Sequence, residues 1–440
     1  MSIATQLTVA AVQPTPVFLD RDATVERLVL CVKEAAAAGA RLIVFPEAIV
    51  PGYPDFVWRL PAWQDRAWYE RLHDQAVDIP GPVTEALGAA AAEAGAWVAV
   101  GVNERTRSGT LYNSLLYLSP DGAVAGVHRK LLPTGGERTV WGCGDGSTLT
   151  VIDTEFGRIG GLLCWENLMP LARAAMYQQG IDILLAPTWD NSDAWMSTLR
   201  HVAREGRVFV VGTNTCLHSR DIPRSLPGAD ELYPLDNDDD WLARGNTAIV
   251  APDGTVLAGP LTGQAGMLIT TIDLSELTAA RREFDPVGHY ARPDVFQLTV
   301  HRPHPTSTIV GEDPIGAFLG AIEAAVVHET DAFANTAVLD ATVPNWRFSV
   351  EGADAIRAEY AKWFREPATF VQLERTPIRD GELVTYELEW TENGIRHRGH
   401  HAHRIVVAQG KIVRDTVWCG GRWPEPLLHD MASASARPSS

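Results

Sequence analysis

Three reactive side chains each follow a short apolar run in the sequence. Glu47 follows Leu-Ile-Val-Phe-Pro, Lys130 follows Val-His-Arg, and Cys164 follows Gly-Gly-Leu-Leu. Taken singly, each has an ordinary structural interpretation as a surface carboxylate, a solvated lysine or a buried apolar thiol. Together they could perform nucleophilic catalysis, because a thiol needs a base to become a nucleophile and a cation to stabilise the charge that develops on the attacked group.

Cys164 lies between a predicted strand and a predicted helix, so backbone N–H groups and the positive end of the helix should lie near its sulfur. A free thiol is only a few per cent ionised at pH 7, so complete ionisation would gain at most roughly 30-fold, or about 2 kcal/mol. Enzymes lower barriers by more than about 8 kcal/mol. Positioning and charge stabilisation, by Lys130 and backbone N–H groups, must therefore contribute most of the effect.

The elements that position these residues alternate along the first 280 residues as short apolar strands and amphipathic helices, which predicts an α/β layered domain with a mixed sheet. Pro-Asp-Gly sequences at 120–122 and 252–254 are turn signals, so hairpins are also expected. The predicted strands lie at 7–12, 42–45, 97–101, 159–163, 183–186 and 208–212. The predicted helices lie at 22–38, 84–94 and 168–179.

Residues 218–240 interrupt this alternation. They contain Pro223, Pro227, Gly228 and Pro234, and they end in an acidic run. This composition predicts a long surface loop. A metal site in the acidic run is the less favoured alternative.

The three reactive segments together resemble the nitrilase superfamily of carbon–nitrogen hydrolases, over about residues 6–300. The matching motifs are Phe-Pro-Glu at 45–47, His-Arg-Lys-Leu-Leu-Pro-Thr at 128–134 and Leu-Cys-Trp-Glu-Asn at 163–167. The spacings between the three motifs are ordinary for that family. The resemblance implies an αββα four-layer sandwich over residues 1–300.

The resemblance also implies a role for each matching residue. Glu47 would be the general base, Lys130 the cation that stabilises the intermediate, and Cys164 the nucleophile. Glu137 would be a second glutamate that holds Lys130 and the substrate, with a surface glutamate as the alternative. The backbone N–H of Trp165 would be a second donor to the developing negative charge.

Finer motifs at 141–147, 164–171 and 287–294 are similar to the nitrilase branch of the superfamily. That branch converts a nitrile and two waters to a carboxylic acid and ammonia, and needs no metal or organic cofactor. The expected partner is therefore a small-molecule nitrile. The alternatives are an amidase or N-carbamoyl hydrolase of the same superfamily, or a catalytically silent protein that binds a ligand or assembles subunits.

The motifs indicate the reactive residues more clearly than they indicate the shape of the substrate pocket. Gly135 and Gly136 stand where relatives often have bulkier side chains, so we expect a roomier pocket. Candidate pocket aromatics, each equally explained as core packing, are Tyr53, Trp58, Trp189 and Trp195.

In the last third of the chain, the sequence predicts a linker at 301–313, a separate α+β domain at 314–430 and a flexible tail at 431–440. We expect helices first, at 315–328 and 353–364, and then strands near 371 and at 383–390, 402–407 and 412–418. Segments at 343–348, 352–356, 400–403 and 410–412 resemble the SnoaL-like, nuclear-transport-factor-like α+β cone.

The likeness leaves the role of this domain open. Assembly of subunits is the favoured interpretation, and a second ligand pocket or an independent activity are the alternatives. His401 and His403 alternate on one strand face, where packing is favoured over a metal site. The nitrilase branch usually assembles through surfaces near its C-terminal tail, and a domain stands there in this chain, so we expect a closed homo-oligomer.

Composition restricts the class of partner and the compartment. The formal net charge is −18, which argues against nucleic acid or an anionic membrane surface as the main partner. The five cysteines show no CxxC spacing, which favours free thiols in a reducing compartment over disulfides or zinc. We expect no signal peptide and no transmembrane run, and therefore a cytoplasmic protein.

Overall fold

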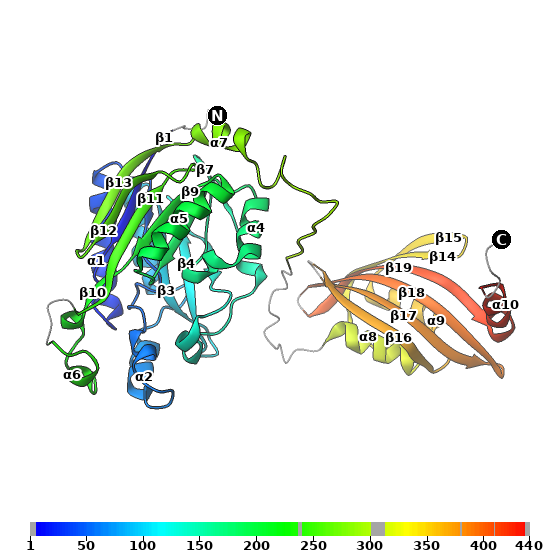
Figure 1. The fold of residues 1–440 in the computed structure, drawn as a ribbon. Coiled ribbons are helices and arrows are strands. Elements are labelled where there is room, and N and C mark those ends of the chain that lie inside the picture. The colour runs from blue at the N-terminus through cyan, green and yellow to red at the C-terminus, as the bar shows by residue number, and fades with distance from the viewer. Residues whose placement is uncertain (1–5, 236–239, 301–312, 379–380, 409, 436–440) are drawn as a thin grey trace. The chain divides into compact units, whose positions relative to one another are not determined.

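The computed structural model describes residues 6–235, 240–300, 313–378, 381–408 and 410–435 (Figure 1). Contacts within the chain divide it into two compact units, Met1–Arg302 and Pro303–Ser440, and each is described by itself. The predicted linker lies outside the described residues except for Asp313. Within the described ranges, no helix is long and apolar enough to cross a membrane.

The first unit contains two mixed sheets. The first sheet has the order β13-β1-β2-β3-β4-β5, with β1, β2 and β3 parallel and the other neighbours antiparallel. Its strands are β1 (Gln6–Gln13), β2 (Leu42–Val44), β3 (Trp97–Arg105), β4 (Leu111–Leu118), β5 (Val124–Arg129) and β13 (Gly266–Asp273).

The second sheet has the order β10-β11-β9-β8-β7-β6, with β12 paired to β11. Strands β7, β8 and β9 are parallel. The strands are β6 (Ile152–Thr154), β7 (Gly157–Gly161), β8 (Ile183–Thr188), β9 (Phe209–Asn214), β10 (Cys216–His218), β11 (Trp241–Val250) and β12 (Val256–Thr262). The two predicted Pro-Asp-Gly turns connect β4 to β5 and β11 to β12.

The two sheets pack face to face between two pairs of helices. Alternate side chains of β1 show why: Ala10 and Val12 pack with the helices, whereas Val9 and Ala11 pack with the second sheet. Helices α1 (Arg21–Ala37) and α3 (Pro82–Ala94) cover the first sheet, and α4 (Pro170–Gln178) and α5 (Asp193–Gly206) cover the second. The remaining helices of this unit are α2 (Arg66–Asp74), α6 (Ala229–Leu232) and α7 (Glu276–Glu283).

The segment predicted as a surface loop at 218–240 differs from the expectation. Ile222, Ala229 and Tyr233 are buried in a cluster with Phe56 and Trp68, and α6 forms within the segment. The rings of Trp68 and Tyr233 lie 5.7 Å apart. The prediction is wrong here because proline and glycine break regular structure without keeping the apolar residues between them in water. Residues 236–239 of the acidic run lie outside the described residues.

The second unit is a six-stranded sheet with the order β15-β14-β19-β18-β17-β16. Helices α8 (Pro314–Glu323) and α9 (Ala353–Trp363) share one apolar core with the sheet (Figure 1). The strands are β14 (Phe333–Val343), β15 (Trp346–Glu351), β16 (Ala368–Ile378), β17 (Gly381–Glu392), β18 (Ile395–Ala408) and β19 (Lys411–Pro424). Helix α10 (Glu425–Ser435) includes the start of the segment predicted as a tail.

The predicted order of helices first and strands afterwards is wrong, because the hairpin β14–β15 lies between α8 and α9. Its turn passes through Pro344 and Asn345, and Asn345 has a φ of +67°. The buried face of β14 carries the small residues Ala337 and Ala341, and the other face carries the apolar Val338, so the alternation that indicates a strand is weak.

Candidate active site

Glu47 follows β2 directly and is completely buried. Its Oε1 accepts hydrogen bonds from Lys130 Nζ at 2.7 Å and from Asn113 Nδ2 at 2.7 Å. Its Oε2 is also buried and has no hydrogen-bond partner among the described residues. A buried carboxylate oxygen with a free lone pair is suited to accept a proton from a bound reactant.

Lys130 follows the end of β5 and is 1% exposed. Its ammonium group donates to Glu47 Oε1 at 2.7 Å and to Glu137 Oε2 at 2.8 Å. It also lies 5.8 Å from the ring centroid of Trp141. Burial opposes the charged form, but the charges of Glu47 and Glu137 raise the pKa of Lys130 above its ordinary value. Lys130 is therefore a fixed cation.

Glu137 lies in a short 3₁₀ turn, Gly135–Thr139, and is 2% exposed. Its Oε2 also accepts a hydrogen bond from the backbone N–H of Thr134 at 2.6 Å. Its Oε1 accepts a hydrogen bond from the hydroxyl of Tyr53 at 2.7 Å. Both carboxylate oxygens are thus held, which fixes the position of the lysine between the two glutamates.

Cys164 begins a 3₁₀ turn, Cys164–Leu168, that follows β7. Its φ is +50°, an uncommon value for a residue with a side chain, and its sulfur accepts a hydrogen bond from Thr188 Oγ1 at 3.1 Å. Burial first, and the charge of Glu47 next, raise the pKa of the thiol to about 12 against the opposing effect of Lys130. The resting sulfur is therefore a neutral thiol.

Burial, together with the nearby charge of Glu137, raises the pKa of Glu47, and Lys130 only partly offsets this. Two carboxylates thus share one buried cation. A carboxylate with a raised pKa in the same buried site as a protonated thiol is able to accept a proton, and a buried cation is able to stabilise negative charge.

Glu166 connects the lysine segment to the cysteine segment, a role that the sequence did not reveal. Its carboxylate accepts hydrogen bonds from the backbone N–H of Leu131 at 2.7 Å and of Leu163 at 2.6 Å, and it pairs with His128 at 2.9 Å. Burial opposes the ion pair, but Glu166 raises the pKa of His128 above its ordinary value. Glu166 lies within the motif at 163–167, but its contacts with the lysine segment cannot be read from that motif.

Gly101 in β3 lies directly behind Glu47. A Cβ atom at this position would lie 2.3 Å from the carbonyl oxygen of Pro46 and 2.7 Å from the Cα of Glu47. The backbone N–H of Gly101 donates to the same Pro46 oxygen at 3.1 Å. Only glycine lets β3 approach the Glu47 segment this closely.

A cavity of about 390 Å³ opens onto Cys164. The ring of Tyr53 stacks on that of Trp189, with centroids 4.3 Å apart and planes 7° apart, and both line the cavity. Trp165 also lines it, and its indole N–H donates to Asp190 at 2.9 Å. Glu137 is also among the residues that line this cavity, whereas Glu47 and Lys130 are buried and are not part of the lining.

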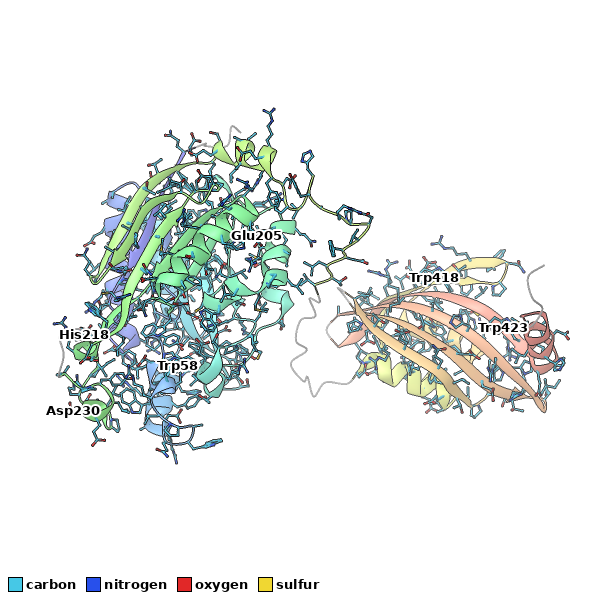
Figure 2. The ribbon with its side chains drawn as sticks, in the orientation of Figure 1. Trp58, Glu205, His218, Asp230, Trp418 and Trp423 are labelled. Carbon is cyan, nitrogen blue, oxygen red and sulfur yellow. The ribbon has the colours of Figure 1, made fainter. Side chains whose placement is uncertain are left out.

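The other two candidate pocket aromatics, Trp58 and Trp195, differ in their location. Trp58, which is labelled in Figure 2, is among the residues that line the cavity. Its indole N–H donates to the hydroxyl of Tyr53 at 3.1 Å. Trp195 in α5 is 2% exposed and packs in the core between α5 and the second sheet. Trp195 is therefore a packing residue.

The expectation of a roomier pocket at Gly135 and Gly136 is wrong. A Cβ at Gly135 would lie 3.0 Å from the ring of Trp58, and one at Gly136 would lie 2.8 Å from the backbone oxygen of Val57. The ring of Trp58 occupies the space that larger side chains would take at these two positions. The two glycines make room for a tryptophan and not for substrate.

Comparisons with known proteins agree on one family. The profile of the carbon-nitrogen hydrolase family matches residues 8–282. An aliphatic nitrilase of Sinorhizobium fredii is 44% identical over 311 residues, which are 70% of this chain and 99% of that protein. A bifunctional nitrilase/nitrile hydratase of Nicotiana tabacum is 39% identical over 308 residues, 68% of this chain and 86% of that protein.

A solved structure of a carbon-nitrogen hydrolase from Helicobacter pylori G27 has a TM-score of 0.52 and 22% identity, and the match covers 66% of this chain and 97% of that chain. This likeness shows the fold alone. The extent of the family match and the identity to the relatives together show that the chain belongs to the carbon–nitrogen hydrolases of the nitrilase superfamily. The family match lies in the first unit, which holds the buried Glu47, Lys130, Cys164 and Glu137.

The first prediction concerns Gly101. The substitution Gly101→Ala should lower kcat/KM by about 100-fold, because the added methyl group must displace the backbone that carries Glu47, and misplacement by about 1 Å can cost that much. Steady-state kinetics of nitrile hydrolysis measure the change. Gly266→Ala in β13 is the matched control, since its Cβ would meet nothing closer than 3.5 Å. Unchanged kinetics in Gly101→Ala would show that Glu47 does not need this support.

Proposed function

We propose that this chain is a nitrilase, which hydrolyses an organic nitrile to the carboxylic acid and ammonia. One observation carries the proposal: a buried cysteine faces a cavity in front of a lysine held between two glutamates. The identity of 44% to an aliphatic nitrilase, over nearly all of that protein, supports nitriles as the substrate class.

The first half of the reaction consumes the nitrile and one water. Glu47 takes the proton of Cys164 while the sulfur attacks the nitrile carbon, which gives a thioimidate. Lys130 and the backbone N–H of Trp165 stabilise the charge that develops on nitrogen. Water then adds to the thioimidate carbon, the nitrogen is protonated, and ammonia leaves a thioester on Cys164.

The second half regenerates the enzyme. Glu47 removes a proton from a second water, which attacks the thioester carbon and releases the carboxylic acid and the free thiol. If the tetrahedral intermediate expels sulfur before ammonia, the product is an amide. The name of the Nicotiana tabacum relative includes both activities, and for this chain we propose the acid as the main product.

The second prediction tests the substrate class. Wild-type protein should release ammonia from nitriles and leave the matching amides unreacted, and intact-mass analysis should find a covalent adduct on Cys164. Cys164→Ala should form no adduct, because the attacking sulfur is missing. Turnover of amides with inert nitriles would instead support an amidase or N-carbamoyl hydrolase. An adduct that persists in Cys164→Ala would refute the assignment of Cys164 as the nucleophile.

We also propose that the second unit is a SnoaL-like α+β domain that contributes to a cytoplasmic homo-oligomer. Trp346 and Trp418 support an interface, because their side chains are 69% and 46% exposed and large aromatic residues are enriched where proteins associate.

The third prediction follows from these tryptophans. Sedimentation of the full chain should show a closed oligomer, and the double substitution of Trp346 and Trp418 by serine should shift it toward smaller species. Serine removes the large aromatic surface that the proposed interface would bury, and both substitutions lie in the second unit, whereas the active site lies in the first. A wild-type monomer at micromolar concentration would contradict the proposal.

A further inference from the structure

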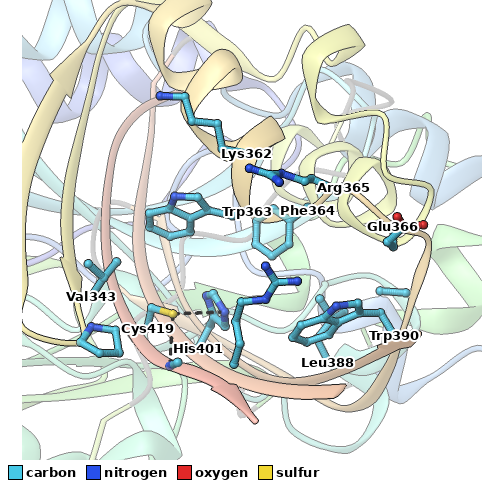
Figure 3. Close-up of a pocket in the computed structure, with 14 residues that line it drawn as sticks. Val343, Lys362, Trp363, Phe364, Arg365, Glu366, Leu388, Trp390, His401 and Cys419 are labelled. Atoms are coloured by element: carbon cyan, nitrogen blue, oxygen red, sulfur yellow. Dashed lines mark hydrogen bonds between the residues drawn. The ribbon is translucent and has the colours of Figure 1, made fainter. Parts of the chain in front are cut away.

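The second unit contains a cavity of about 390 Å³ that plays no part in the reaction above (Figure 3). The end of α9 forms one side of it, and strands β17, β18 and β19 form another. Small-molecule sites have volumes of about 300–1,000 Å³. The cavity is therefore large enough for a ligand with one ring and a few substituents.

The walls of this cavity are mostly aromatic and aliphatic. Trp363 and Phe364 come from the end of α9, and Leu388 and Trp390 come from β17 (Figure 3). Phe364 is 6% exposed and Leu388 is 3% exposed, so both are fixed in the core. Aromatic walls of this kind favour a flat apolar ligand, because rings gain from stacked and edge contacts as well as from burial.

A thiol and an imidazole lie side by side on the same wall. The sulfur of Cys419 lies 3.6 Å from Nε2 of His401 and accepts a hydrogen bond from the backbone N–H of Gly421 at 3.3 Å. The register of β18 against β19 shifts beside this pair, between Gly399 and His401. Irregularities of this kind turn a side chain from its regular direction and are frequent beside functional sites.

His401 has an unsatisfied polar atom. Its side chain is 6% exposed, and its Nδ1 has no hydrogen-bond partner among the described residues. Its neighbour His403 differs, since its two ring nitrogens contact Asp415 at 3.0 Å and the hydroxyl of Tyr386 at 3.1 Å. Buried polar atoms normally have a partner. Because Nδ1 has almost no accessible surface, His401 presents its ring to the cavity and not this unpartnered atom.

The interior of the cavity is uncharged. Burial first, and the charges of His403 and His400 next, lower the pKa of His401 to about 3, so its imidazole is neutral. Burial raises the pKa of Cys419, so its thiol is neutral as well. A charged group placed against these two side chains would lose its hydration without gaining an opposite charge.

Charged residues occur only at the rim, where they are exposed. Lys362 pairs with Glu359 at 2.6 Å, and Arg422 pairs with Glu392. Arg365 and Glu366 add one charge of each sign. The rim is therefore balanced and does not select an anion or a cation.

We propose that this cavity binds an uncharged aromatic or alicyclic molecule that carries one polar group. The ring lies against Trp363, Phe364 and Trp390, and the polar group lies toward Cys419 and His401. The binding is non-covalent, because the thiol is protonated and the pKa of its neighbour His401, lowered to about 3 by burial, makes that imidazole a poor base. The site therefore differs in chemistry from the one around Cys164.

The fourth prediction tests this site in the full chain with 4-fluoroacetophenone, a neutral ring compound with one acceptor that is neither a nitrile nor an amide. Titration followed by ¹⁹F NMR should show saturable binding. 4-Fluorobenzoate should bind at least about 10-fold more weakly, because its charge would enter an uncharged cavity. No saturable binding of the ketone, or tighter binding of the benzoate, would overturn the proposal.

Two substitutions on β17 locate the binding. Leu388→Trp fills the cavity and should abolish it, whereas Leu383→Trp makes the same change at an exposed position outside the cavity and should leave it intact. Binding confined to the cavity at Cys164 would be equal in the two variants and would contradict the proposal. If Leu388→Trp does not fold, Trp390→Ala should weaken binding by about 10-fold through loss of the ring contact, and an unchanged affinity there would also contradict it.

Discussion

The burial of one ammonium group between two carboxylates is the constraint on which the first unit depends. Removing a charge from water costs several kcal/mol, and the cost is recovered only if the partners have good geometry and every remaining polar atom is satisfied. Lys130 meets this condition through Glu47 and Glu137 at 2.7 and 2.8 Å. Loss of Lys130 would leave two buried carboxylates without their cation, at a cost of about 3–5 kcal/mol.

The surrounding structure keeps these three groups in place. Asn113 and Tyr53 each donate to one of the glutamates, and the packing of β3 at Gly101 fixes the segment that carries Glu47. Two oxygens of this network, Oε2 of Glu47 and Oδ1 of Asn113, have no hydrogen-bond partner among the described residues. The network thus holds Glu47 in place while leaving one of its oxygens free to accept a proton.

The sequence indicated the reactive residues because they lie in short contiguous motifs that follow predicted strands. It did not indicate Asn113, Thr188 or Gly101, since nothing local distinguishes them and their importance arises from contacts across the sheets. The error at the glycine pair has the same cause. Space left at Gly135 is filled by Trp58, a residue that is distant in sequence.

For the fold, too, some elements could be predicted from the sequence and others could not. Strongly periodic elements such as α1 and α3 lie within two residues of their predicted bounds. The hairpin β14–β15 was missed because alanines on its buried face give a weak apolar signal. The segment at 218–240 was taken for a surface loop because the burial of Ile222, Ala229 and Tyr233 depends on Phe56 and Trp68. Tertiary contacts, which a single sequence does not display, decide both cases.

The central claim is that the resting site holds a neutral thiol and that Glu47 removes its proton only as the sulfur attacks. The direct measurement is the ultraviolet absorbance of the thiolate, taken as the difference between wild type and Cys164→Ala from neutral pH to about pH 9. With the pKa of Cys164 raised to about 12, we expect no thiolate signal in this range. A full thiolate signal already present at neutral pH would contradict the account.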